Sequence, residues 1–352
     1  MPISTLIPMP DSIPVGSSWF EGLTIFTFAL HILLVNILVG GTVLSLFLNR
    51  KDANGAAAQL SQKLPTVFAL AVNLGVAPLL FLQVVYGQFF YTSSILSAGL
   101  WLSVIVLLIA GYAALYVNQA RNQAAPGTGT PWLWFAFIVM LCIGVELSTV
   151  MSTMIRPEAW VAYVGRAKGF ILNFSDPTFI PRFLHFFFAS LAVGGLSVAL
   201  LVHYKKSKGQ KMDETDSRLG MKIFVIATCL QMATGIWWLL SLKQPVMLRF
   251  MGGNTMATIM LAAGLIFAVA ALIAGVGRKP LQTAIWTGLT VLTMAVLRDI
   301  VRNASLDPWF SPENLEVTGD TSSFALFIVT LIVGLAVILY MLKLGFRKNR
   351  EA

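Results

Sequence analysis

Residues 20–48 read FEGLTIFTFALHILLVNILVGGTVLSLFL, an apolar run that contains only two ionisable side chains, Glu21 and His31. A helix needs about 20 mainly apolar residues to cross the hydrocarbon core of a bilayer. The run is longer than that, starts well inside the chain and has no basic segment before it. It therefore predicts a membrane-spanning helix rather than a cleaved signal peptide.

Eight further runs of this kind follow along the chain, at 66–90, 95–118, 131–154, 180–203, 221–242, 255–277, 282–301 and 322–343. The whole sequence is 57% hydrophobic and 11% charged, with a mean hydropathy of +0.80. Soluble domains carry roughly 25% charged residues, so a soluble, disordered or fibrous protein is excluded.

The predicted fold class is all-α: a polytopic membrane helix bundle of about nine transmembrane helices. We expect one integral-membrane helical domain over residues 1–352, with a cofactor-bearing bundle at about 20–277 and C-terminal helices at about 282–343. We find no soluble domain and no internal repeat in the sequence.

The charge pattern predicts the orientation of the chain. There are 24 Lys and Arg against 15 Asp and Glu, a net charge of +9, and most basic residues fall in short loops between the runs. Sixteen lie on one side of a nine-span map: Arg50, Lys51, Lys63, Arg121, Lys205, Lys206, Lys208, Lys211, Arg218, Lys222, Arg278, Lys279, Lys343, Arg347, Lys348 and Arg350. Seven lie on the other side: Arg156, Arg166, Lys168, Arg182, Lys243, Arg249 and Arg302. The positive-inside rule predicts an outside N-terminus and a cytoplasmic C-terminus, in a multi-pass protein of the cell inner membrane, with lipid and not nucleic acid as its surroundings.

Ionisable residues inside apolar runs are functional candidates, because burying them in lipid costs free energy. His31 lies in the first run, Glu146 in the fourth and His185 in the fifth. Neutral imidazole is a common haem ligand, and Met is a frequent partner on the opposite face of the iron. Met260 lies in the seventh run, and at the helical rise His185 and Met260 each lie about 8–10 Å from the outer end of their helices.

The same residues also have a simpler interpretation. A single intramembrane His often forms only an interhelical hydrogen bond, and a single Met often only fills a core. The third histidine, His203, stands beside Tyr204, Lys205 and Lys206, and we interpret it as a residue of the membrane boundary. The two cysteines lie in apolar runs, and no C-x-x-C-H sequence for covalent haem attachment is present.

The segment 181–204, PRFLHFFFASLAVGGLSVALLVHY, resembles the fifth span of subunit I of the cytochrome bd quinol oxidases. In that family the His of this span is an axial ligand of the low-spin haem b, which the resemblance places on His185. The other axial ligand is a Met followed by small residues and Gly. The stretch 259–267, IMLAAGLIF, is similar and places it on Met260.

Three weaker similarities fall in the same order as in the family. The first run resembles the family's first span, whose His belongs to the second, oxygen-reducing haem region, here His31. The stretch around Gln88 and Phe89 is similar to a phenylalanine–glutamine–phenylalanine segment. Pro308 and Trp309 stand where the family has a proline–tryptophan motif.

The chain also departs from the family. The long quinol-oxidising loop between spans six and seven is reduced to residues 242–254. The third span, 100–116, has none of the family's proton-handling carboxylates. Asn303 stands where the family has a glutamate ligand, and Thr258 stands where it has an arginine. The resemblance thus implies that an electron-transfer haem is kept while the oxygen-reducing apparatus is largely lost.

These observations predict a membrane b-type cytochrome, an electron-transfer subunit of a quinol-linked oxidoreductase. It would carry haem b on His185 and Met260, with His31 as the place for a second haem and Glu146 as a proton-accepting or haem-facing carboxylate. The expected partners are a quinone or quinol and a second membrane subunit or an outer-face c-type cytochrome. Two alternatives stay open: a divergent cytochrome bd-type quinol oxidase subunit, and a haem-free membrane anchor or transport subunit.

Overall fold

The computed structural model describes residues 3–48, 55–163, 169–170 and 172–351. Four basic residues of the charge pattern lie outside these ranges: Arg50, Lys51, Arg166 and Lys168. The described residues form helices and connecting segments without a β-strand, apart from one isolated bridge between Ile13 and Val317. The all-α class predicted from the sequence is confirmed.

In the described part of the chain, eight helices are long and apolar enough to cross a membrane. They are α1 (Ser17–Leu48), α3 (Leu64–Leu96), α4 (Ala98–Ala124), α5 (Thr130–Met154), α7 (Phe179–Ser207), α8 (Glu214–Ser241), α10 (Thr255–Val276) and α11 (Pro280–Leu306). Each corresponds to one of the first eight predicted spans, so the polytopic membrane bundle is confirmed. The ninth span falls on α12 (Thr321–Glu351), in which the stretch Thr321–Gly334 is apolar.

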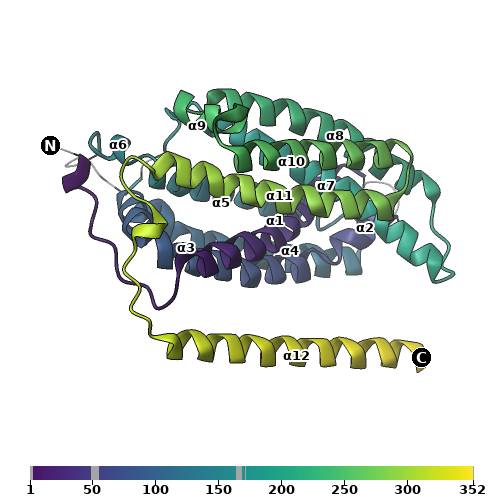
Figure 1. Ribbon diagram of the computed structural model, residues 1–352. Helices are drawn as coiled ribbons and strands as arrows, with labels where there is room; N and C mark the ends of the chain where they lie inside the picture. Colours follow the sequence, from purple (N-terminus) through teal and green to yellow (C-terminus); the bar gives the residue numbers. More distant parts are fainter. Residues whose placement is uncertain (1–2, 49–54, 164–168, 171, 352) are drawn as a thin grey trace.

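Short helices connect the long ones at the two ends of the bundle. They are η1 (Ile3–Thr5), α2 (Ala56–Ser61), α6 (Pro157–Trp160), α9 (Gln244–Leu248), the π-helical turn η2 (Arg249–Gly253) and η3 (Pro312–Asn314). Figure 1 shows the N-terminus, α6 and α9 at one end, and α2 and the C-terminus at the other. We call the first the predicted outer end, after the charge pattern.

The eight long helices form two sets of four. In the first set α1 packs mainly on α3, and α4 on α5; in the second α7 packs mainly on α8, and α10 on α11. The two sets meet where α1 packs along α7. The expected boundary between the cofactor-bearing bundle and the C-terminal helices, near 277–282, falls between α10 and α11. These two helices pack on each other.

Helices α1 and α7 touch backbone to backbone where they cross. A Cβ added to Gly40 would lie 1.8 Å from the carbonyl oxygen of Ser190 and 2.9 Å from the Cα of Gly194. Small residues permit such close approach between helices in a membrane. One turn away, the Ser190 hydroxyl donates a hydrogen bond of 2.9 Å to the Asn36 side-chain oxygen. The crossing thus holds the two sets of helices together.

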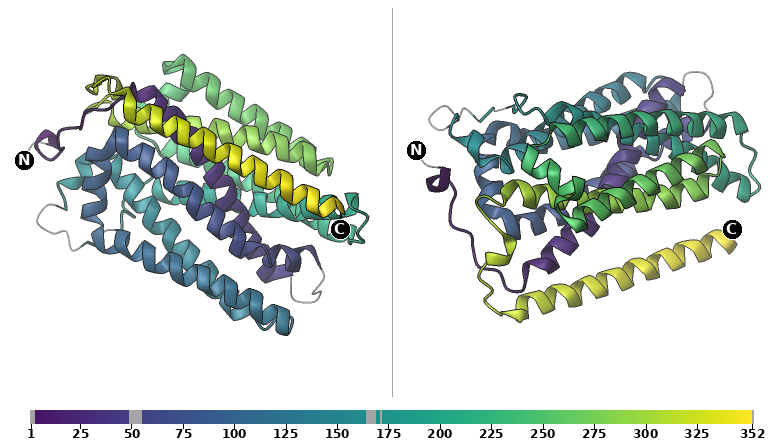
Figure 2. Two further views of the ribbon diagram at one scale, coloured as in Figure 1. Left: turned by 90° about the horizontal axis from the view of Figure 1, so that it is seen from below. Right: turned by 45° about the horizontal axis from the view of Figure 1, so that its top comes forward.

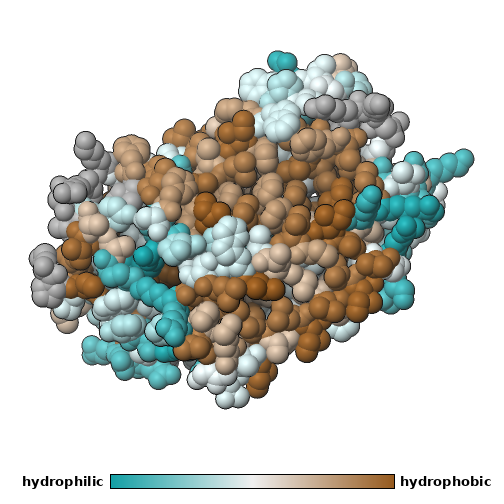
Figure 3. All heavy atoms as spheres, turned by 90° about the horizontal axis from the view of Figure 1, so that it is seen from above, coloured by the Kyte–Doolittle hydropathy of each residue, from teal (hydrophilic) through white to brown (hydrophobic). Residues whose placement is uncertain are grey.

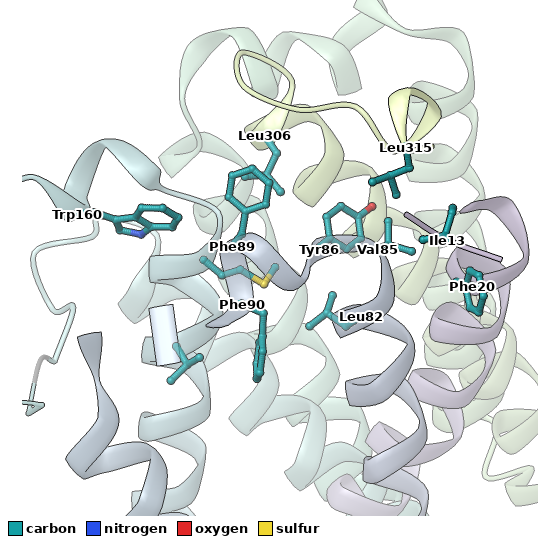
Figure 4. Close-up of a cluster of buried hydrophobic side chains, with 12 residues drawn as sticks. Ile13, Phe20, Leu82, Val85, Tyr86, Phe89, Phe90, Trp160, Leu306 and Leu315 are labelled. Carbon is teal, nitrogen blue, oxygen red and sulfur yellow. The ribbon is translucent and has the colours of Figure 1, made fainter. Parts of the chain in front are cut away.

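Aromatic side chains close the predicted outer end. Trp160, Tyr86 and Phe89 are fully buried there together with Ile13 and Leu306. In Figure 4 these side chains come from α3, α6, the end of α11 and the segment before α1. The Trp160 indole N–H donates a 2.9 Å hydrogen bond to the carbonyl of Thr153, which ties α6 to the end of α5.

Helix α3 stays helical through Pro78, where the sequence suggests a kink. Its one non-helical residue is Tyr86 (φ −120°, ψ 25°), which belongs to the aromatic cluster and precedes Gly87. The local change in backbone therefore lies where α3 meets the other elements of the predicted outer end.

The outer surface of the helices is apolar. On α4, for example, Ile105, Val106 and Ile109 are largely exposed. Figure 3 shows apolar side chains over the middle of the molecule and hydrophilic ones gathered toward its ends. Helix α12 lies at the edge of the bundle (Figures 1 and 2), and its ring contacts come from Phe324 and Phe327 at its beginning. This distribution is that of a protein surrounded by lipid.

Candidate functional site: a histidine-lined cavity

His185 lies on α7 and is buried within the second set of helices. One of its two ring nitrogens forms a hydrogen bond. Its Nδ1 lies 2.9 Å from the carbonyl oxygen of Gln231 on α8. A carbonyl only accepts, so Nδ1 carries the proton and Nε2 keeps its lone pair. Gly235 makes room for the ring, because a Cβ there would lie 3.0 Å from the imidazole Cε1. This is how metal-binding histidines are commonly oriented by a second group.

A cavity of about 200 Å³ adjoins this imidazole. On the same measure one water needs roughly 10–15 Å³, so the space admits a large ligand. Helices α1, α7, α8, α10 and α11 line it, mostly with apolar and aromatic side chains. The polar exceptions are His185, Gln231, Asn36, Arg298, Thr228, Thr287 and Thr290. The Thr287 hydroxyl is buried there without a hydrogen-bond partner.

His31 repeats the arrangement of His185 in the first set of helices. Its Nδ1 lies 2.8 Å from the carbonyl oxygen of Ala71 on α3. A Cβ on Gly75 would lie 2.7 Å from the His31 Cε1. In both sites the glycine follows the accepting carbonyl by four residues, one helical turn. His31 is therefore also held as the tautomer with an unprotonated Nε2.

Helices α1 and α7 share a short sequence pattern that begins at these two histidines. His31 is followed after eight residues by Gly40 and Gly41, and His185 after eight residues by Gly194 and Gly195. The equivalent residues Gly40 and Gly194 touch each other, as do Asn36 and Ser190. Contact between equivalent positions is expected on a two-fold axis. The sequence thus carries H-x8-G-G once at the first helix of each set, a short recurrence that the expectation of no internal repeat did not include.

The structure brings some predicted residues together and leaves others apart. Met260 is partly buried and packs against a cluster of buried side chains that includes Val246 and Phe250, and it is not among the residues that line the cavity of His185. Met232 and Met294 do line it. Neither methionine was predicted from the sequence. Their placement depends on how α8 and α11 are rotated about their axes.

Glu146 lies away from the cavity, on α5 where it faces α4. Its Oε1 accepts a hydrogen bond of 2.9 Å from the Ser103 hydroxyl, and its Oε2 is buried without a partner among the described residues. Its expected role in proton transfer stays a prediction. The residue that shares its buried polar site is Ser103, which carries no charge.

Asn303 belongs to a polar network that links α1, α3 and α11 below the aromatic cluster. Its amide donates to Glu21 over 3.1 Å, and the Tyr86 hydroxyl donates to the same carboxylate over 3.1 Å. Tyr86 also hydrogen-bonds to the Asn303 side-chain oxygen. Asp299 completes the network and forms a buried ion pair of 2.6 Å with Arg302. The network fixes the end of α11 against α1 and α3.

The described residues contain no group of three or more His, Cys, Asp and Glu side chains that would bind a bare metal ion. Haem needs only one or two axial side chains, so the cavity and its imidazole are the relevant observations. No known family model matches the chain, and no curated protein is significantly similar to it. The resemblance to cytochrome bd subunit I stays a prediction based on the quoted residues.

Proposed function

We propose that this chain is a membrane b-type cytochrome that binds haem b in the cavity beside His185. It would transfer electrons between a membrane quinone and a redox partner at the predicted outer end. The observation that supports this most directly is the imidazole of His185, whose Nδ1 is bound to a carbonyl and whose Nε2 is left free for iron.

The other residues of the cavity fit a haem. Apolar side chains from five helices offer a dry surface for a macrocycle, and Met232 and Met294 are thioethers within the same cavity. The unpartnered Thr287 hydroxyl is a polar group that a ligand would satisfy. When bound there, haem b would supply a one-electron iron couple.

The chain's own residues would orient the group and keep water away from it. The carbonyl of Gln231 holds the His185 ring in one orientation and raises its basicity as a ligand. Trp238 packs on the imidazole with 5.8 Å between ring centroids. Its size and rigidity keep the ring from turning away from the cavity.

A second, smaller cavity supports electron exchange at the predicted outer end. It measures about 80 Å³ and shares Trp238, Leu242 and Val301 with the larger one. Its remaining lining includes Arg156, Asp176, Arg182 and Lys243, which are polar groups suited to a quinone head or a partner protein. The repeated geometry at His31 supports a second haem in the first set of helices.

Reduced-minus-oxidised spectra and a pyridine haemochrome count on the purified chain test the proposal. We expect a low-spin haem b spectrum that His185→Ala removes. His203→Ala is the matched control, because His203 lies on the same helix but is exposed at its other end. An unchanged spectrum in His185→Ala would refute the ligand assignment. A colourless wild-type protein would favour the anchor or transport alternative, and a CO-binding haem the oxidase alternative.

A further inference from the structure

Arg298 is a charged residue that the proposed haem ligation does not use, and it lines the same cavity as His185. It lies on α11, and its guanidinium stands over the ring of Phe28 on α1 with 4.2 Å to the centroid. A guanidinium stacked on an aromatic ring still has its N–H groups free at the edge. Those donors are available to a ligand in the cavity.

The described residues offer Arg298 no carboxylate partner. The adjacent Asp299 binds Arg302 over 2.6 Å with one oxygen and Asn303 over 3.4 Å with the other. No ion pair within 4.0 Å joins Arg298 to any described acidic residue. The charges of Arg302 and Arg182 repel Arg298, and the charge of the adjacent Asp299 attracts it without forming an ion pair. The residues that line the cavity thus include one positive charge, that of Arg298, and no Asp or Glu.

An unpaired arginine within a membrane costs free energy, because its charge is taken out of water without compensation. Such residues normally form an ion pair or face a ligand site. A neutral apolar ligand would leave this charge uncompensated. We propose that the ligand of the cavity carries a carboxylate that pairs with Arg298. This rests on the proposed function, in which the ligand is haem b and the carboxylate is one of its two propionate groups.

The pairing would determine how the ligand sits. His185 would fix the centre of the macrocycle, and Arg298 would fix its edge from a different helix. Two parallel N–H···O bonds from one guanidinium to one carboxylate give geometric specificity as well as attraction. A neutral quinone would then be a poor competitor for this cavity, because it could not satisfy Arg298.

The test compares haem b with its dimethyl ester, which has the same macrocycle without the two charges. The full-length chain is produced in cells that cannot make haem and is titrated in detergent with each compound, using the Soret band as readout. For the wild type we expect tighter binding of haem b by on the order of 10- to 100-fold, as for one charge-assisted hydrogen-bond pair. Arg298→Gln should abolish most of this preference, and Arg298→Lys should restore part of it. Arg218→Gln is the control, because Arg218 is an exposed arginine on α8.

The outcomes separate this inference from the proposed function. Equal affinity of the wild type for haem b and its ester would overturn the role of Arg298 while haem binding itself stands. The same preference in Arg298→Gln as in the wild type would also overturn it, because a group other than Arg298 would then bind the carboxylate. Failure of the wild type to bind either compound would overturn both proposals. Because the ester comparison uses the unaltered protein, a folding defect in a variant cannot decide the result.

Discussion

Replacing Gly40 with alanine should separate the two sets of helices. The new Cβ would lie 1.8 Å from the Ser190 carbonyl oxygen, while an ordinary carbon–oxygen contact is about 3.3 Å. The helices α1 and α7 must therefore move apart by about 1.5 Å at their crossing. All three nearest atoms are backbone atoms, so no side chain can rotate away. A gap of roughly 0.5–1 Å already forfeits a quarter to a half of a dispersion contact, and overpacking costs typically 1–3 kcal/mol. We expect a loss near the upper limit, about 3 kcal/mol.

Gly22→Ala provides the matched control on the same helix. Nothing lies within 4 Å of a Cβ at Gly22, so this substitution should gain roughly 0.5–1 kcal/mol from helix propensity. Reversible unfolding in mixed micelles, followed by tryptophan fluorescence, measures both variants. We expect a difference of about 4 kcal/mol between them, the sum of the loss at Gly40 and the gain at Gly22. Equal stability of the two variants would refute the close crossing of α1 and α7.

Three further predictions concern the network, a helix end and the second axial ligand. Tyr86→Phe removes the hydroxyl between Glu21 and Asn303 and should lower the free energy of unfolding by about 1–3 kcal/mol in the same assay, because it leaves the Asn303 side-chain oxygen without its donor. The backbone N–H of Thr215 donates to Asp213 and holds the pKa of that carboxyl below its usual value of 3.8. Asp213→Ala should therefore reduce stability at neutral pH, and the difference should vanish as the pH falls through that lowered pKa; a difference that persists in acid would contradict the cap. Because Met232 and Met294 line the cavity and Met260 does not, Met232→Leu or Met294→Leu should lower the midpoint potential of the proposed haem and Met260→Leu should not; the reverse result would favour the ligand implied by the family resemblance.

The membrane fold follows from the sequence because a bilayer permits few solutions. A run such as 20–48 must satisfy its backbone groups internally, and a helix is the structure that does so within one segment. The depth of His185 follows equally from its position in the run and the helical rise. Both inferences need only local information, which a single sequence contains.

The arrangement around the cavity depends on information that the sequence does not carry locally. Helix α10 is apolar on all sides, so no apolar stripe fixes its rotation and no pattern decides whether Met260 or its neighbour Leu261 faces the cavity. The partner of His185 is a backbone carbonyl, which every residue possesses. The free guanidinium of Arg298 depends on Asp299 binding Arg302 instead. The recurrence of H-x8-G-G is visible in the sequence itself, but it consists of only two histidines and two glycine pairs.

The number of helices in each set has a consequence for the orientation of the two sets. Each set contains four predicted crossings, an even number, so the second set enters the membrane in the same direction as the first. An odd number would have inverted it, as in the many transporters built from oppositely oriented halves. A two-fold axis through the contact of Gly40 with Gly194 would therefore run along the membrane normal. Both imidazoles precede the contact of Gly40 with Gly194 by nine residues and so lie on the same side of it, at the same level in the bilayer.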